Sequence, residues 1–267
     1  GLDPGPRHKA AIWEAVLALA SAPEAERTMT GFCLLVQSQE IKAALTPFTL
    51  EGPYGRLLDG DEDALAFSGL ACFELDALMQ FPAAAGPVLT YLFHRLTERF
   101  DGSPTLLLLD EAWLLLDHPV FAAQIRDWLK TLRKRNVAVV FATQSLADIE
   151  SASIAPAIID ACPVRIFLPN ERAREPVQAA TYLGFGLNSR QIDLISEAVP
   201  KRDYYYTSPL GCRLFELGLG PVARAFCASA SPEDQARITE VEAAAGPGGF
   251  APAWLTARGL GWAGDLL

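Results

Sequence analysis

The chain has 267 residues, of which 51% are hydrophobic and 20% charged, a composition typical of a globular protein and not of a disordered one. Its 22 Lys and Arg stand against 32 Asp and Glu, and the net charge of −10 argues against a protein whose main work is gripping phosphate backbones. We expect no membrane-spanning helix, since no apolar run reaches roughly 18 residues, and no secretory leader. Five scattered cysteines without a CxxC pair indicate a reducing cytoplasm rather than a disulfide framework or zinc site.

Residues 1–64 predict a helical subdomain. Ile12, Val16 and Leu19 belong to one apolar stripe at helical spacing, and a second helical face runs from Phe32 to Leu45. Residues 51–63 are rich in glycine, proline and acids and predict a loop. Its DGDED string lacks the ligand spacing of an EF-hand, so we expect it to be solvated.

Residues 65–230 predict an α/β core. Apolar runs at residues 71–75, 105–110, 137–142 and 164–168 predict buried strands, and residues 88–100 and 120–135 predict amphipathic helices. Strands that are apolar throughout and alternate with helices indicate a parallel sheet covered on both faces.

The C-terminal part predicts two features. Residues 213–217 and 222–228, separated by a Gly- and Pro-containing segment, predict a C-terminal β-hairpin. Residues 231–267 predict a tail, in which the Gly/Pro-rich stretch 246–249 and the last 20 residues are loosely tethered.

Two carboxylates follow the strand predicted at residues 105–110. The edge at the carboxyl ends of the strands is where open α/β sheets bind ligands. Consecutive strand residues point in opposite directions, so Asp110 and Glu111 serve different purposes. In P-loop NTPases the first acid holds the magnesium shell, and the second is placed to take a proton from the attacking water. The alternative is a helix N-cap aspartate followed by a solvated glutamate.

Polar side chains also follow the next strand, where Thr143, Gln144 and Ser145 come directly after residues 137–142. A strand–helix–strand unit with an amide at the second strand end has the RecA-type layout, in which a Gln or Asn of the neighbouring strand contacts the γ-phosphate or the attacking water, a role that Gln144 fits. Thr143 joins Asp110 as a nucleotide-binding candidate. The alternative is a capping role before the next helix, for which serine is a favoured residue.

Several strings carry a family resemblance: LLLLDEAW at 106–113, DWLKTLRKRN at 127–136, VAVVFATQS at 137–145, IFLPN at 166–170, KRDYYYTSPLG at 201–211 with the RLFELGLGP after it, and LEGPYGRLLDG at 50–60. Together they resemble the large ATPases of type IV secretion and conjugal transfer, the TrbE-like proteins. The similarity runs from about Arg27 to Ala228. The resemblance implies a RecA-like P-loop NTPase motor core with a helical insertion, which uses ATP and Mg²⁺.

The resemblance also implies roles and partners. Asp110, with the Walker B acids, would hold Mg²⁺ through water, Glu111 would polarise the attacking water, and Gln144 would sense the γ-phosphate. The partners would be further copies of the chain in a ring, such as a hexamer, and other inner-membrane components of the machine. Such motors lie in the cytoplasm, peripheral to the bacterial inner membrane, and power assembly or transfer of DNA and protein.

The phosphate-binding half of the site is missing from this sequence. A P-loop needs a glycine-rich backbone and a Lys-Ser/Thr pair, but none of the five lysines follows a glycine and precedes Ser or Thr. In the family the P-loop lies upstream of the helical insertion, and the Gly1 start is consistent with a piece that begins after it. We therefore expect this chain alone to bind nucleotide weakly or not at all.

Basic residues after the acid pair are candidates for a residue that acts on a neighbouring subunit. Arg133 and Arg135 are the first candidates, although a basic last turn also suits a helix C-terminus. Arg165 and Arg202 are weaker candidates. Tyr204–Tyr206 could stack bases, but a half-buried strand is the simpler interpretation.

Three functions follow from these observations. The first is an ATP-driven motor component of a type IV secretion or conjugation machine. The second is a DNA translocase or coupling ATPase of the same superfamily, which the net charge disfavours. The third is a docking or scaffold domain without enzymatic activity.

Overall fold

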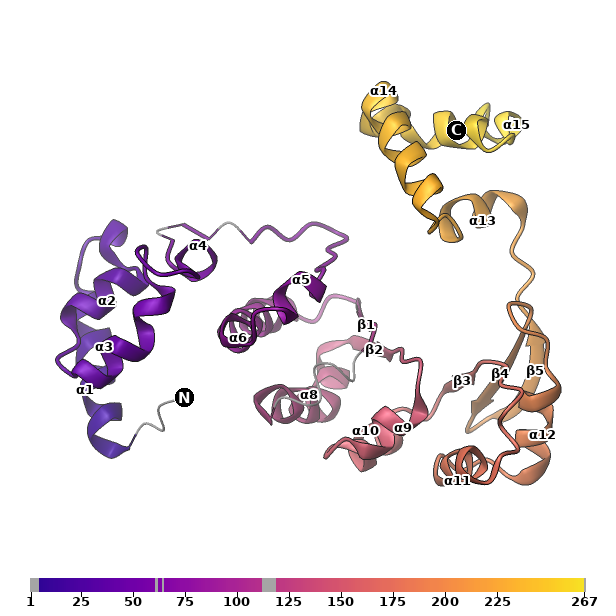
Figure 1. The fold of residues 1–267 in the computed structure, drawn as a ribbon, viewed down its shortest axis with the longest axis horizontal. Helices are drawn as coiled ribbons and strands as arrows, with labels where there is room; N and C mark the ends of the chain where they lie inside the picture. The colour runs from indigo at the N-terminus through magenta and orange to yellow at the C-terminus, as the bar shows by residue number, and fades with distance from the viewer. Residues whose placement is uncertain (1–4, 61, 64, 112–118, 267) are drawn as a thin grey trace. The chain divides into compact units, whose positions relative to one another are not determined.

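The computed structural model describes residues 5–60, 62–63, 65–111 and 119–266 of the chain. The chain divides into two compact units, Gly1–Ala157 and Ile158–Leu267 (Figure 1). The three-part division at residues 64 and 230 stays a prediction.

The first unit begins with helices, as the sequence predicts. Their bounds are α1 Pro6–Ala20, η1 Glu24–Glu26, α2 Met29–Leu35, α3 Gln39–Leu45, η2 Thr46–Phe48 and α4 Gly55–Leu58. Side-chain caps fix two of the starts: the Thr28 hydroxyl accepts the Gly31 N–H at 3.0 Å, and the Ser38 hydroxyl accepts the Ile41 N–H at 3.4 Å. A small core of Ala15, Phe32, Val36 and Ile41 holds the helices together.

The acidic loop is not fully solvated, and that prediction is wrong. Asp59 is 7% exposed and accepts hydrogen bonds from the Thr30 hydroxyl and the Thr30 backbone N–H, the latter at 3.1 Å. The Thr30 hydroxyl oxygen in turn accepts the Leu50 N–H at 3.1 Å. Asp59 therefore ties the chain after α4 to the first turn of α2.

We expect the Asp59 bonds to make the stability of this chain pH-dependent. Burial alone would raise the pKa of Asp59, but the bonds from Thr30 outweigh it and leave the pKa below its usual value. A lowered folded-state pKa contributes stability above the unfolded value of about 3.9, and that contribution is lost as pH falls through the folded value. Urea unfolding of residues 1–267 between pH 6 and pH 3 measures it. Asp59→Asn should flatten the acid limb of the curve, whereas Glu51→Gln, at an exposed position, should leave it unchanged. An Asp59→Asn curve parallel to the wild-type curve would contradict this role.

The middle of the chain carries the parallel pair of strands. The elements are α5 Asp76–Met79, α6 Pro82–Arg99, β1 Thr105–Leu109, α8 Pro119–Thr131, η3 Leu132–Arg135, β2 Val137–Phe141, α9 Leu146–Ser151 and α10 Ala155–Ala161. β1 and β2 are parallel, with Thr105 opposite Val137 and Leu109 opposite Phe141. The predicted helices and these two strands are thus confirmed, to within one residue at each end except that α6 begins six residues before its predicted start.

The sheet departs from the prediction in two ways. Residues 71–75 form no strand and are mostly exposed, because a short apolar run does not by itself distinguish a strand from other structure. Leu106, Leu108 and Val140 lie on one face of the sheet. They are 61%, 63% and 46% exposed, respectively, so the described residues do not cover this face. The expected covering of both faces is therefore incomplete in the described part of the chain.

An aromatic cluster packs α6 against α8. The Trp128 ring lies 4.8 Å from the Phe93 ring and 5.6 Å from the Phe100 ring, and Phe93 lies 5.2 Å from Phe121, all centroid to centroid and all near edge-to-face. All four side chains are buried. Because α8 leads through η3 into β2, this cluster fixes the strand that precedes Gln144.

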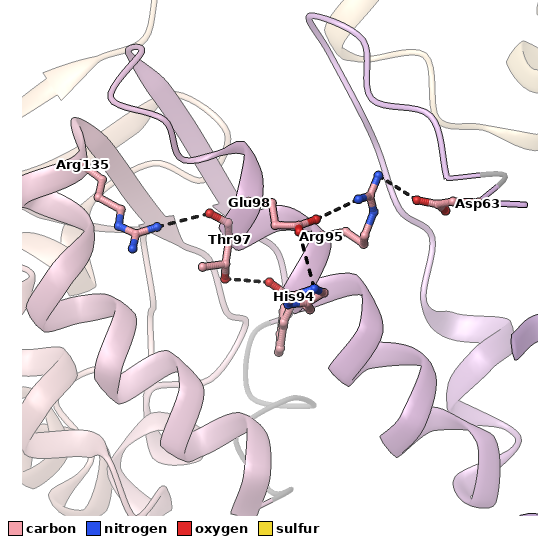
Figure 2. A network of polar contacts seen from close by, with 7 residues as sticks. Asp63, His94, Arg95, Thr97, Glu98 and Arg135 are labelled. Atoms are coloured by element: carbon pink, nitrogen blue, oxygen red, sulfur yellow. Dashed lines mark hydrogen bonds and ion pairs between the residues drawn. The ribbon is translucent and has the colours of Figure 1, made fainter. Parts of the chain in front are cut away.

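Polar contacts hold the C-terminal half of α6 (Figure 2). Arg95 pairs with Asp63 at 2.7 Å and with Glu98 at 2.8 Å, and His94 lies 3.6 Å from Glu98. Arg135, on η3, donates to the Thr97 carbonyl at 3.3 Å. The network therefore joins α6 to the end of the acidic loop and to the segment that enters β2.

The second unit has its own antiparallel sheet. Its elements are β3 Arg165–Phe167, α11 Pro176–Gly184, α12 Ser189–Glu197, β4 Asp203–Ser208, β5 Gly211–Glu216, α13 Pro221–Cys227, α14 Pro232–Ala257 and α15 Gly261–Gly264. The strand order is β3–β4–β5, with both pairs antiparallel. The run at residues 164–168 is thus a strand, but it pairs antiparallel with β4 and is not a third strand of the parallel sheet.

A C-terminal hairpin is present, but only one of its two predicted strands is confirmed: residues 213–217 lie almost wholly in β5, whereas residues 222–228 form no strand. β4 and β5 form it around Pro209 and Leu210, with Ser208 opposite Gly211. Residues 222–227 lie in α13 instead, because Pro221 occupies the first helical turn, where its missing N–H costs nothing. Tyr205 is 2% exposed on the inner face of β4, as expected for a half-buried strand.

The last residues are held more firmly than predicted. α14 runs through the Gly/Pro-rich stretch with a kink at Gly246, whose φ of 67° is a value that glycine adopts readily. Trp254 is 1% exposed, and its indole N–H donates to the Ala225 carbonyl at 2.8 Å. Across the described ranges, none of the helices combines the length and the apolar character needed to cross a bilayer.

Candidate active-site edge

The carboxyl ends of β1 and β2 bring the predicted site residues to one edge of the sheet. The ladder continues one step past the strands, since the Ala142 N–H donates to the Leu109 carbonyl at 2.9 Å. Asp110 and Glu111 leave β1 at this point, and Thr143 and Gln144 leave β2 beside them. Trp113, the last residue of the LLLLDEAW string, lies outside the described residues.

Glu111 and Gln144 are in direct contact. The Gln144 side-chain amide donates a hydrogen bond to Oε1 of Glu111. Glu111 has a φ of 49°, a left-handed conformation that few residues other than glycine adopt. At this turn the side chains no longer alternate between the two faces of the sheet. The Glu111 side chain lies beside the end of β2. The sequence predicts both residues but gives no signal for the contact between them.

Asp110 is exposed at the same edge. Its Oδ1 accepts the Glu111 N–H at 3.2 Å. A carboxylate oxygen is a ligand that Mg²⁺ prefers, and Mg²⁺ keeps several waters and binds substrate phosphates rather than an all-protein cage. Among the described residues there is no group of three or more His, Cys, Asp or Glu side chains that could hold a metal. Asp110 thus fits an ion held mainly by phosphate and water.

Thr143 is engaged locally. Its hydroxyl accepts the Ser145 N–H at 3.3 Å and lies 3.2 Å from the Ser145 carbonyl oxygen. This closes the turn that leads from β2 into α9. The geometry is that of a local turn, and Ser145, the N-cap residue of α9, makes no side-chain capping bond among the described residues, so both the capping role and the role in nucleotide binding stay predictions.

The basic candidates lie at the other edge of the sheet. Arg133 and Arg135 precede β2, whereas Gln144 follows it, and five strand residues span about 16 Å. The Arg133 side chain is exposed and makes no hydrogen bond or ion pair within the described ranges, while Arg135 binds the Thr97 carbonyl. Neither is placed to reach the acid pair of its own chain, so a part in hydrolysis would require another subunit, and the alternative of a basic helix end is also compatible with this placement.

The other candidate arginines have partners in their own unit. Arg165 donates to three carbonyls, those of Ile159, Cys162 and Phe185, at 2.7, 3.1 and 2.6 Å. Arg202 pairs with Asp203 at 2.9 Å. These bonds give both residues structural roles that the sequence pattern does not reveal, because the partners of Arg165 are carbonyl groups of the backbone.

The comparisons with known proteins identify the family. The family described as the TraG P-loop domain matches residues 36–200. The chain belongs to this family. It is 47% identical over 241 residues to the conjugal transfer protein TrbE of Rhizobium radiobacter, which covers 90% of this chain and 29% of that protein. It is also 47% identical over 239 residues to a probable conjugal transfer protein TrbE of Sinorhizobium fredii, covering 89% of this chain and 36% of that protein.

More distant relatives and a solved structure agree with this. The type IV secretion system protein virB4 of Bartonella henselae is 30% identical over 194 residues, or 71% of this chain and 24% of that protein. The structure of VirB4 of Thermoanaerobacter pseudethanolicus matches with a TM-score of 0.60 at 18% identity, over 83% of this chain and 66% of that one. The predicted resemblance and fold class are confirmed. The chain spans about a third or less of the length of these curated relatives.

Proposed function

We propose that this TraG-type P-loop domain carries the hydrolytic edge of an ATPase motor in a type IV secretion or conjugal transfer machine. The observation that carries the proposal is the juxtaposition of Glu111 and Gln144 beside Asp110 at the carboxyl edge of β1 and β2. The kind of machine is inferred from the relatives, which are named as conjugal transfer and type IV secretion proteins.

The roles follow from the chemistry of each side chain. Asp110 holds the water shell of Mg²⁺, which when bound neutralises charge on the phosphates. Glu111 accepts a proton from the attacking water as the water oxygen bonds to the γ-phosphorus and the bond to the bridging oxygen breaks. Gln144 donates its amide N–H to the γ-phosphate.

The phosphate cradle is supplied outside residues 1–267. The chain has no Gly-rich segment followed by Lys-Ser/Thr, so we expect hydrolysis only from a longer protein that contains residues 1–267 together with a phosphate cradle, called here the full-length gene product. In the proposed ring, copies of the protein associate, and Arg133 is the better candidate to act on a neighbour, because Arg135 is bonded to Thr97. Because the relatives are conjugal transfer and type IV secretion proteins, we infer that the motor works in the cytoplasm, at the inner membrane, beside other components of the system.

Phosphate release from Mg-ATP by the full-length gene product tests the proposal. We expect turnover that needs Mg²⁺ and does not need DNA. Turnover that depends on added DNA would favour the translocase or coupling alternative. Self-association or partner capture without any ATP binding would overturn the enzymatic proposal in favour of a docking domain.

A further inference from the structure

Resting on the proposed function, we propose that Gln144 is a latch on Glu111: the amide holds the carboxylate until a γ-phosphate takes the amide over. Hydrolysis would then be coupled to the presence of the third phosphate through one side-chain hydrogen bond.

The contact itself is the first argument. The Gln144 amide N–H bonds to Oε1 of Glu111, a carboxylate oxygen that would otherwise accept the proton of the attacking water. A hydrogen bond to an ionised acceptor is among the stronger ones in proteins. It therefore takes up one lone pair of Oε1 and, above all, fixes the direction of the side chain.

The backbone is the second argument. Glu111 lies in the left-handed region, which is unfavourable for a residue with a Cβ. The Asp110 carboxylate accepts the Glu111 N–H in this conformation at 3.2 Å. Glu111 is thus held from both ends, by Asp110 at its backbone and by Gln144 at its side chain.

Competition between two anions for the Gln144 amide, whose two N–H groups share one nitrogen, is the third argument. A γ-phosphate within reach of Gln144 presents anionic oxygens, which accept charge-assisted hydrogen bonds. Two anions around one amide repel each other, so the amide N–H that turns to the phosphate leaves Glu111. The lone pair of Oε1 that the amide leaves can then accept the proton of the water. A nucleoside diphosphate has no γ-phosphate and leaves the latch closed.

The latch makes a quantitative prediction about nucleotide affinity, because binding of the triphosphate must break the bond. In the full-length gene product, Glu111→Ala should tighten a non-hydrolysable ATP analogue by about tenfold, the equivalent of a hydrogen bond to a charged group at an exposed site. The affinity for ADP should not change. Isothermal titration of both nucleotides, with Mg²⁺ present, measures the two affinities.

A double-mutant cycle separates the latch from simple charge repulsion. Removing the Glu111 charge could also tighten the analogue directly, and this gain would persist in any background. The latch requires that the tightening disappear when Glu111→Ala is made in a Gln144→Leu protein, since the bond between these two side chains is then already absent. Equal tightening in both backgrounds would overturn the latch while leaving the ATPase proposal intact.

A measurement on residues 1–267 keeps the proposal testable if a full-length variant folds poorly. The side-chain amide signal of Gln144 in ¹⁵N-labelled protein, assigned by its loss in Gln144→Leu, should shift on Glu111→Ala. The control Glu171→Gln, at an exposed site in the other unit, should not move it. If the chemical shift of the Gln144 amide is unchanged in Glu111→Ala, the latch is overturned. Absence of ATP binding by the full-length protein would overturn the latch and the proposed function together.

Discussion

Glu111→Gln in the full-length gene product is expected to lower ATP turnover by about 10²–10⁴-fold, the contribution of a general base. The amide keeps the shape of the side chain and its acceptor oxygen, so the contact with Gln144 can persist. What it loses is the ability to take a proton. ATP binding should therefore be retained while phosphate release falls.

Steady-state phosphate release and nucleotide titration measure the two quantities side by side. Glu171→Gln is the matched control, because Glu171 is exposed and belongs to the other compact unit of the chain. It should keep wild-type turnover. Turnover within about threefold of wild type in Glu111→Gln would remove Glu111 from the role of base, since a base contributes at least about 10²-fold.

Trp128→Ala is expected to destabilise the chain by about 3–5 kcal/mol, the usual cost of emptying a buried aromatic site. Trp128 is 3% exposed and packs between Phe93 and Phe100. Its indole N–H meets no acceptor among the described residues. Trp128→Phe therefore leaves no hydrogen-bond acceptor unpaired among these residues, and it should lower the free energy of unfolding much less.

Urea unfolding of residues 1–267, followed by circular dichroism, measures these costs. Trp262→Ala is the control, because Trp262 is 60% exposed and surface changes stay within about 0.5 kcal/mol. A loss below about 1 kcal/mol for Trp128→Ala would mean that the aromatic cluster does not fix α8 against α6. Because α8 leads into β2, a large loss should also disturb the edge that carries Gln144.

The strands and the site edge could be predicted because their signals are local. Runs such as 105–110 and 137–142 are continuous and apolar, and each ends in polar residues, so the sequence alone puts Asp110, Glu111 and Gln144 at one edge. The same local signal fails at residues 71–75, where a short apolar run has no strand partner among the described residues. It also fails at Val164–Leu168, because apolar character does not distinguish parallel from antiparallel pairing.

The contacts that complete the site could not be predicted. They join residues that are distant in the sequence, and they depend on backbone and side-chain conformations that the sequence pattern does not reveal. The bond between Gln144 and Glu111 accompanies a left-handed backbone at a residue that rarely adopts it. Arg135 looks like a basic helix end, yet it binds a carbonyl 38 residues earlier. Pattern and spacing suggest which side chains carry the chemistry, but not which groups hold them.

Titration of Mg-ATP into residues 1–267 and into the full-length gene product, by calorimetry, tests most directly the claim that this chain holds the hydrolytic edge of a divided site. We expect no binding heat for residues 1–267 and clear binding for the full-length protein, whose Glu111→Gln variant binds but does not hydrolyse. Tight binding by residues 1–267 alone would contradict the claim, because it would require a phosphate cradle within this chain.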